Sequence, residues 1–407
     1  MSTLNLETNP KQPANFSLFN LGFRPFFLGA GIFSSLAILL WLMLFQGMMT
    51  LPVDNITLTE WHSHEMIFGF TLAVATGFLL TAVKNWTGVN TPSGAPLAIL
   101  FSLWIGGRIG WFLPALLPNL SFEILLVTAA FDLLFNLYFA IAFAQPILKT
   151  KQWKQTGLLA KVMLMGLFNA IFYLGVFGII DDGIWLGTYG GFFIILALVL
   201  NMGRRVIPFF IEKGVAETVT LANPKWIDHG SLGLFLLLTL SELFAQSPKL
   251  TAVIALLLFF VGNMRLINWY TPGIWAKPML WSLYLGMVFI QMGFAFYAIE
   301  AFIPGFKSLA IHALTMGGIG LITLGMMTRV SLGHTARNVN EPPKSHATIL
   351  RLIVLATLIR TLFPALLPEH YALWIMLSQF LWISAFALFT VRFAPMLIQK
   401  RIDGHFG

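Results

Sequence analysis

The chain has 407 residues, of which 58% are hydrophobic and only 10% are charged. An average soluble domain carries about 25% charged residues, and no soluble core absorbs so much apolar surface. The sequence contains no cysteine, which excludes disulfides, iron–sulfur clusters and thiolate metal ligands, so a bound metal must use His, Met, carboxylate or backbone donors. We attribute the net charge of +8 to loops that fix membrane orientation, and we expect no nucleic-acid partner.

Apolar runs long enough to cross a lipid bilayer recur along the whole chain. One span needs about 20 apolar residues, because a helix rises about 1.5 Å per residue and the hydrocarbon core is about 30 Å thick. The polar segment 1–24 precedes the first run, which lacks a cleavage site and is expected to be a retained anchor. The runs predict an all-α polytopic protein, a single transmembrane domain with spans at residues 26–46, 62–83, 96–113, 121–145, 158–180, 184–203, 227–246, 250–269, 279–300, 308–328, 347–367 and 371–392.

The basic residues predict that both termini lie in the cytoplasm, because Lys and Arg are retained on that side of a membrane. With segment 1–24 inside, the outward loops contain only Lys249 and Lys307, whereas Arg108 and Arg360 fall within spans. The outward loops carry acidic residues instead: Asp54, Glu60, Asp181, Asp182 and Glu369.

The second, sixth and tenth predicted spans share one texture of early glycines, an apolar middle and a basic inner end. They read GFTLAVATGFLLTAVK, GGFFIILALVLNMGRR and GGIGLITLGMMTR. This similarity at intervals of four spans favours three four-helix units. The simpler alternative is that glycine-rich helices with basic ends are common in membranes.

Three histidines lie at comparable depth near the outer face. His62 and His64 stand in the run WHSHEM where the second span begins, and His312 lies just inside the tenth. Residues two apart on a helix diverge by about 200°, so His62 and His64 serve two neighbouring sites unless the first turn is unwound. His62 shares a helix face with Glu65 or Met66. Histidine with methionine suits copper or an electron-transfer haem, histidine with carboxylate suits a harder metal, and the alternative role is interfacial anchoring.

Two arginines approach the level of these histidines from the third and eleventh spans. Arg108 and Arg360 could each hold a haem propionate, because the guanidinium group matches a carboxylate with two donors. The competing interpretation pairs them with Asp132 and Glu242 as structural ion pairs within the membrane. The sequence leaves both open.

A second set of basic residues marks the inner ends of the spans. Two arginine-rich helix ends could bind an anionic ligand, a lipid head group or a haem propionate, although ordinary positive-inside charge explains them as well. His334 cannot join the outer histidines, because about 20 residues of helix separate it from them by a bilayer thickness. The members of this set are Arg24, Arg204, Arg205, Arg329, His334 and Arg337.

Five segments carry a resemblance to a known family. They are LGFRPFFLGA at 21–30, WHSHEMIFGF at 61–70, GFLLTAVKNWTG at 77–88, GRRVIPFF at 203–210 and HALTMGGIGLITLGMMTRVSLGHTAR at 312–337. The chain resembles the NnrS family of bacterial membrane proteins. The resemblance implies haem b and copper, a bacterial inner (cytoplasmic) membrane location, and a role in denitrification and in tolerance of nitric oxide or nitrosative stress. The family residues carried over are His62, His64, His312 and His334, with Arg24, Arg204, Arg329 and Arg337 as companions.

Haem-copper oxygen reductases offer a looser analogy. They have twelve spans in three four-helix arcs, and histidines of the second and tenth spans hold their low-spin haem. The present chain lacks the histidines of the sixth and seventh spans that would build the usual copper centre, which argues against oxygen reduction.

These observations give two classes of function. The first is a haem site ligated by His312 with His62 or His64, with copper on the remaining histidine and on Met66 or Glu65, which would bind or redox-handle nitric oxide and need an electron-donor or reductase partner. The second is a transporter of protons, metal ions or small anions. A maturation factor for nitrite or nitric oxide reductases is a further alternative.

Overall fold

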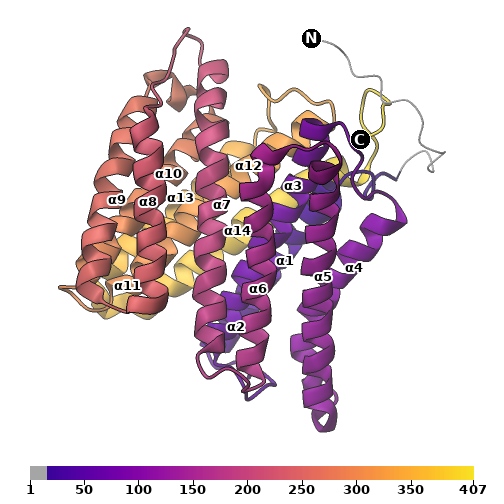
Figure 1. The fold of residues 1–407 in the computed structure, drawn as a ribbon, viewed down its shortest axis with the longest axis vertical. Helices are drawn as coiled ribbons and strands as arrows, with labels where there is room; N and C mark the ends of the chain where they lie inside the picture. The colour runs from indigo at the N-terminus through magenta and orange to yellow at the C-terminus, as the bar shows by residue number, and fades with distance from the viewer. Residues whose placement is uncertain (1–15) are drawn as a thin grey trace.

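The computed structural model describes residues 16–407. The predicted polar segment 1–24 therefore lies mostly outside the described residues. Residues 16–407 are helical without any strand, and twelve of their helices are long and apolar enough to cross a membrane (Figure 1). The predicted all-α polytopic fold is confirmed.

All twelve predicted spans are helical at the predicted places. In chain order they are α1 (Phe23–Phe45), α2 (Leu58–His64) with α3 (Leu72–Thr87), α4 (Ala95–Ile109), α5 (Ser121–Lys149), α6 (Thr156–Val176), α7 (Gly183–Gly214), α8 (Lys225–Leu240), α9 (Pro248–Trp269), α10 (Pro278–Glu300), α11 (Phe306–His312) with α12 (Leu321–His334), α13 (His346–Leu366) and α14 (Tyr371–Ile398). Several helices extend beyond their apolar run. For example, α7 ends at Gly214, whereas hydropathy predicted an end at residue 203. Backbone hydrogen bonding continues past the apolar stretch, because helices do not need lipid to persist.

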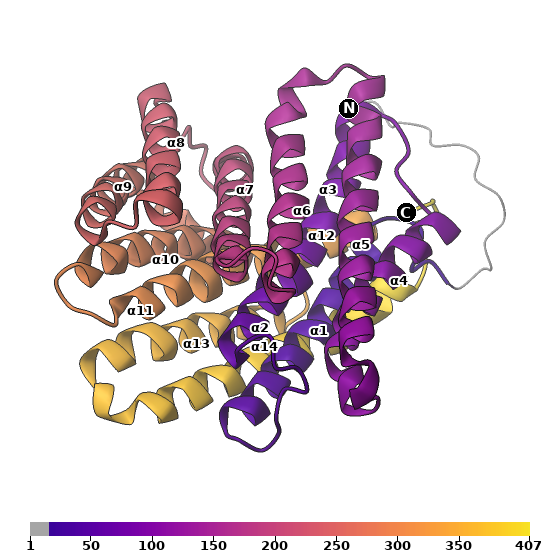
Figure 2. The ribbon, with the colours of Figure 1, turned by 60° about the horizontal axis from the view of Figure 1, so that its bottom comes forward.

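The second and tenth spans form the centre of the bundle. They are the two most buried of the twelve, and α12 packs against α3 while α7 contacts both spans. The first and last spans, α1 and α14, lie side by side (Figure 2). The three spans with the shared sequence texture are thus neighbours in space, and the division into three four-helix units stays a prediction.

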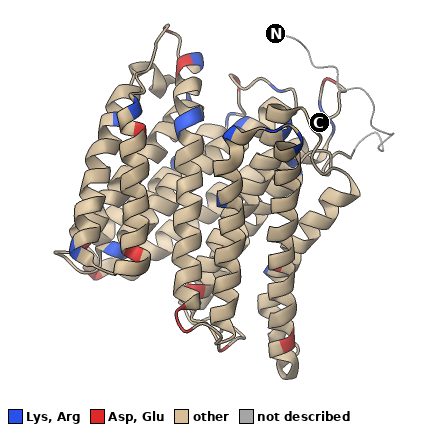
Figure 3. Ribbon diagram, in the orientation of Figure 1, with Lys and Arg blue, Asp and Glu red and all other residues tan. Residues whose placement is uncertain are grey.

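Charge separates the two ends of the bundle. Lys and Arg gather at the end where the C-terminus lies, and acidic residues dominate several loops at the opposite end (Figure 3). We call these the inner and outer ends, following the predicted orientation.

Both central spans change helix type directly after their histidines. The π-helical segment η1 (Glu65–Thr71) follows His64, and η7 (Ala313–Gly320) follows His312. π-Helical segments are rare in proteins, and those that occur often lie at functional sites. Trp104 Nε1 donates to the carbonyl of Gly69 within η1 at 2.9 Å. Each π-helical segment rotates the inner part of its span relative to the histidines at the outer end.

Candidate functional site

A large cavity opens between the first, second, sixth, tenth, eleventh and twelfth spans at their outer end. Its volume is about 630 Å³, within the range of about 300–1,000 Å³ that holds small molecules and cofactors. His62 and His312 line it from opposite central spans, together with Met66, Met316 and Arg360. We call this space the histidine cavity.

Contacts with neighbouring protein groups orient both histidine rings in this cavity. His312 Nδ1 lies 2.7 Å from the carbonyl oxygen of Ser308, so Nδ1 carries the proton and donates it. Nε2 is then left with a lone pair, which is the usual arrangement of a metal-binding histidine. The ring of His62 stacks on Trp41, with 4.5 Å between ring centroids and 15° between planes. The two imidazoles are therefore oriented before any ligand arrives.

Arg360 brings an unpaired positive charge to the cavity. Its Nη2 lies 3.2 Å from Ser308 Oγ and 3.4 Å from the hydroxyl of Tyr371, while its buried Nη1 has no hydrogen-bond partner among residues 16–407. The alternative pairing with Glu242 is wrong, since that carboxylate lies 2.7 Å from Lys307 Nζ. A buried guanidinium group without a counter-ion is costly unless an anion joins it.

His64 belongs to a different site on the other side of the same helix. Its Nδ1 lies 2.9 Å from Glu65 Oε1 and its Nε2 lies 3.0 Å from Asn169 Oδ1. Both ring nitrogens are occupied by protein groups, so neither is open to a metal in this arrangement. His64 and Glu65 do not line the histidine cavity. The side chains of His62 and His64 therefore diverge, as helical geometry predicted.

Arg108 joins this second site and is paired, as the competing interpretation held. Its Nη1 lies 2.5 Å from Glu65 Oε1 and its Nη2 donates to Asp132, which also accepts from the hydroxyl of Tyr173 at 2.8 Å. We call these six buried residues the Arg108 cluster: His64, Glu65, Arg108, Asp132, Asn169 and Tyr173. Its charged groups meet one another, whereas Arg108 Nε and Asn169 Nδ2 are buried without a partner among residues 16–407.

Two glycines make room for the Arg108 cluster. A Cβ atom on Gly69 would lie 2.8 Å from Arg108 Nη1, and one on Gly107 would lie 2.5 Å from Asp132 Oδ1. Sequence reasoning missed these glycines and also missed Asn169 and Tyr173. The only signal in the sequence was a polar side chain in an otherwise apolar span, as in the run MGLFNAIFYL around Asn169.

The inner basic residues form two groups and not one. At the end of α7, Arg204 pairs with Asp228 at 2.7 Å and Arg205 Nη1 donates to Gln155 at 3.1 Å. Arg329 lies over the ring of Phe210, 3.7 Å from its centroid. These contacts are those of a helix end held in place by its neighbours.

The second inner group lies where α1 meets α14. Arg24 is fully buried in the first turn of α1, and its Nη1 donates to the carbonyls of Met396, Leu397 and Gln399 at the end of α14. A cation there complements the negative end of the helix dipole. His334 packs against Phe23, and Nη1 of Arg337 has no partner among the described residues.

His334 lies at the far end of the tenth span from His312, as the helix length predicted. No group of three or more His, Asp or Glu side chains within residues 16–407 is arranged to hold a metal ion. The histidine cavity offers two imidazoles and two thioethers, which suit a soft metal or a haem iron. The carboxylate of Glu60 also lines it and accepts a hydrogen bond from the Thr57 backbone N–H at 2.6 Å.

Comparison with known families places the chain. The family model described as NnrS protein matches residues 17–401, nearly the whole sequence. The chain belongs to the NnrS family. Membership fits a role in the response to nitric oxide in general. No curated protein shows a significant match to the chain.

Proposed function

We propose that this NnrS protein binds haem b in the histidine cavity and handles nitric oxide there as part of the nitrosative stress response. The observation that carries the proposal is the meeting of His62, His312 and the unpaired Arg360 in one cavity of about 630 Å³. Two nitrogen ligands and a free cation are what a haem with its anionic propionates requires.

Several residues of the histidine cavity offer groups that would hold a haem. His312 is the better iron ligand, because the Ser308 carbonyl holds its Nδ1 proton and leaves Nε2 free. Arg360 would hold a propionate through its unpartnered Nη1, with Tyr371 and Ser308 steadying the guanidinium plane. Arg108 is committed to Glu65 and Asp132 and cannot fill this role.

A haem with one imidazole and an open position binds nitric oxide, whereas two imidazoles make an electron-transfer centre. Trp41 fixes the ring plane of His62, so this residue decides whether the second position is filled. Phe70, Phe192 and Trp382 supply apolar walls to the same cavity. The same walls favour an uncharged ligand over an ionic one.

Copper has a smaller donor set in the same cavity. Met66 lies one helical turn from His62 and lines the cavity with it, as does Met316 from the tenth span. Thioether and imidazole together suit copper(I). Glu65, the alternative carboxylate ligand, is occupied by Arg108 and His64. We therefore assign copper to His62 with Met66 wherever His312 alone holds the haem.

The protein would reside in the bacterial inner membrane, where nitric oxide dissolves readily in lipid. Turnover of nitric oxide would need an electron donor or a reductase as partner, whereas binding or sensing would not.

The test is cofactor analysis of protein purified from haem-replete cells. We expect haem b by the pyridine haemochrome assay, copper by metal analysis, and a reduced-minus-oxidised spectrum that changes with nitric oxide. His312→Ala should lose the haem, and His334→Ala should keep it, because His334 lies at the opposite end of the span. Equal loss in both variants would place the iron at the inner end and overturn the assignment.

Two outcomes would favour the other function classes. Colourless, metal-free wild-type protein would favour a transporter that uses Arg360 to bind an anion within the cavity. A coloured protein without turnover, whose deletion abolishes nitrite or nitric oxide reductase activity in cells, would favour a maturation factor.

A further inference from the structure

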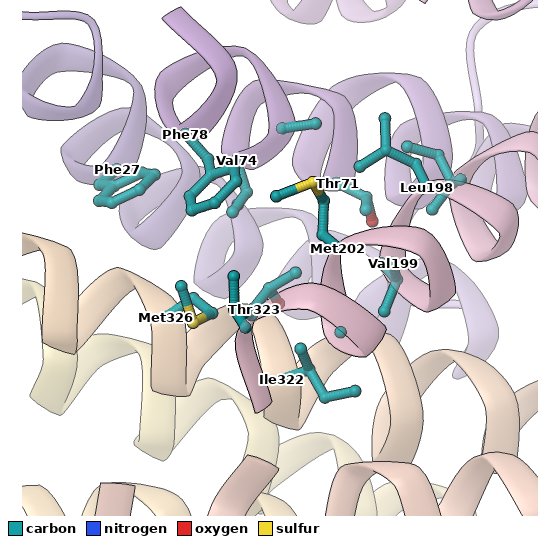
Figure 4. A pocket seen from close by; sticks show the side chains of 14 residues that line it. Phe27, Thr71, Val74, Phe78, Leu198, Val199, Met202, Ile322, Thr323 and Met326 are labelled. Atoms are coloured by element: carbon teal, nitrogen blue, oxygen red, sulfur yellow. The ribbon is translucent and has the colours of Figure 1, made fainter. Parts of the chain in front are cut away.

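A second and smaller cavity lies between the three spans that share a sequence texture. Its volume is about 60 Å³, and α3, α7 and α12 provide most of its walls (Figure 4). Val74, Val199 and Ile322 face it together with the thioethers of Met202 and Met326. We call it the apolar cavity.

The walls of the apolar cavity leave no free hydrogen-bond donor. Its only polar side chains are Thr71 and Thr323. The hydroxyl of Thr71 donates to the carbonyl of Met66 at 2.7 Å, and that of Thr323 donates to the carbonyl of Gly320 at 3.0 Å. A buried water needs two to four polar partners, so this cavity disfavours water.

The size of the apolar cavity limits its occupant. One water molecule takes about 30 Å³ in the liquid, and an apolar cavity of about 150 Å³ accommodates benzene or xenon. A space of about 60 Å³ therefore admits a molecule of a few heavy atoms and excludes a lipid chain or an aromatic ring. A diatomic or triatomic gas fits both its size and its polarity.

The apolar cavity adjoins the histidine cavity, because two residues belong to the walls of both. Thr71, at the end of η1, and Ile195, in the middle of α7, line both spaces. From these two residues the apolar cavity extends inward along α3 to Phe78 and along α7 to Val206. A molecule leaving it past Thr71 and Ile195 arrives beside the imidazoles.

We infer that the apolar cavity is a binding site for a small uncharged gas that exchanges with the histidine cavity. The gas site itself is inferred from the size of the cavity, its polarity and its position beside the histidine cavity. Its identification with nitric oxide rests on the proposed function, because that function supplies the reacting gas. A gas molecule in the apolar cavity would lie beside the histidine cavity, in a space that disfavours water and ions.

Xenon tests the site without any cofactor. Crystals of the full chain pressurised with xenon should show anomalous density in contact with Met202 and Met326. Val199→Phe should remove this density, because the larger ring fills the cavity. Val253→Phe is the matched control. It makes the same change in side-chain size at a residue of α9 that is 58% exposed. Ordered water in place of xenon would overturn the inference.

Gas exchange tests the connection between the cavities. In haem-loaded protein, nitric oxide recombination after flash photolysis should slow about tenfold in Val199→Phe, within the range over which association rates vary among variants of one site. The milder Ala75→Val serves if Val199→Phe does not fold, because Ala75 lines the same space. Unchanged rates with xenon density lost would overturn the exchange route.

The two experiments separate the two proposals. Protein that takes up xenon at Met202 and Met326 but carries no haem would refute the proposed function and leave the gas site standing. Protein that carries haem but shows no xenon there would do the reverse.

Discussion

Arg108 and Arg360 occupy comparable places in their spans and are equally buried, at 6% exposure each, but their surroundings differ. Arg108 meets two carboxylates and lies in a cluster whose other members also bind each other. Arg360 meets two hydroxyl groups and no carboxylate within the described residues, and it faces the histidine cavity. One guanidinium group has its counter-ions inside the protein, and the other lacks them.

This difference between Arg108 and Arg360 distinguishes a charge that stabilises the fold from one that is available to a ligand. A charge inside a membrane protein is costly, so it is retained either in a closed ion cluster or at a site that takes up an opposite charge. The Arg108 cluster fills the first role, and under the proposed function the histidine cavity fills the second. His64 and His62, two residues apart, fall on opposite sides of this division.

The largest expected effect comes from opening the closed cluster. Arg108→Leu leaves Glu65 and Asp132 buried without a counter-ion and should cost about 3–5 kcal/mol of folding stability. Thermal unfolding in detergent measures the loss. Arg351→Leu is the control, because Arg351 is exposed at the start of α13. Equal unfolding temperatures in the two variants would mean that the cluster contributes no more than surface charge.

The corresponding change in the cavity should act on ligand binding and not on folding. Arg360→Leu strands no carboxylate, so stability should change by less than about 1 kcal/mol. Haem affinity should fall about tenfold to a hundredfold, because one charge-assisted contact is worth about 1.5–3 kcal/mol. Titration of haem into the apoprotein measures this. An Arg360→Leu protein that unfolds as easily as Arg108→Leu would erase the distinction between the two sites.

A smaller effect is expected from one hydrogen bond of the cluster. Tyr173→Phe removes the hydroxyl that lies 2.8 Å from Asp132 Oδ2 and should cost about 1–2 kcal/mol. The cofactor spectrum should not change, since Tyr173 does not line the histidine cavity. Tyr138→Phe on α5 is the matched control, because that side chain lies outside the cluster. A spectral change in Tyr173→Phe would show that the two sites communicate.

The smallest effect is expected for an ion pair outside the spans. Two hydrogen bonds from Arg401 lower the pKa of Asp403 from 3.8 to about 2. Because the pKa is lower in the folded state, the pair stabilises the protein above about pH 4, and this contribution is lost as the pH falls towards 2. Its exposure limits the value to about 0–1 kcal/mol. Asp403→Asn should lower the unfolding temperature slightly at pH 7, and the difference from wild type should shrink as the pH is lowered through 4.

Hydropathy predicted the spans well and their ends less well. The twelve runs located every membrane-length helix, but α7 and α12 extend beyond the predicted residues 203 and 328. Apolar composition marks the part of a helix that lies in lipid, whereas caps and neighbouring helices decide where the helix stops.

Sequence reasoning placed three histidines at one depth but could not tell which of them line the same cavity. His62, His64 and His312 do lie at one level, yet only two of them line the cavity. The sequence around Arg108 and Arg360 could not distinguish their roles, because each is a single arginine in an apolar run. The carboxylates that pair with Arg108 lie far from it in the chain, and Arg360 has none among residues 16–407. The sequence predicts one set of basic residues at the inner ends of the spans. The structure divides this set between the inner part of α7 and the junction of α1 with α14.

The sequence by itself determined where the twelve membrane-length helices lie along the chain and how far apart two residues of one helix are, because apolar length and a fixed rise per residue are local properties. Only the tertiary structure decided which way each side chain points and what it meets. The π-helical segments η1 and η7 shift the rotation of the central spans, so helical periodicity alone could not relate residues on either side of them. Packing of distant spans then gave one arginine two carboxylates and left the other facing an open cavity.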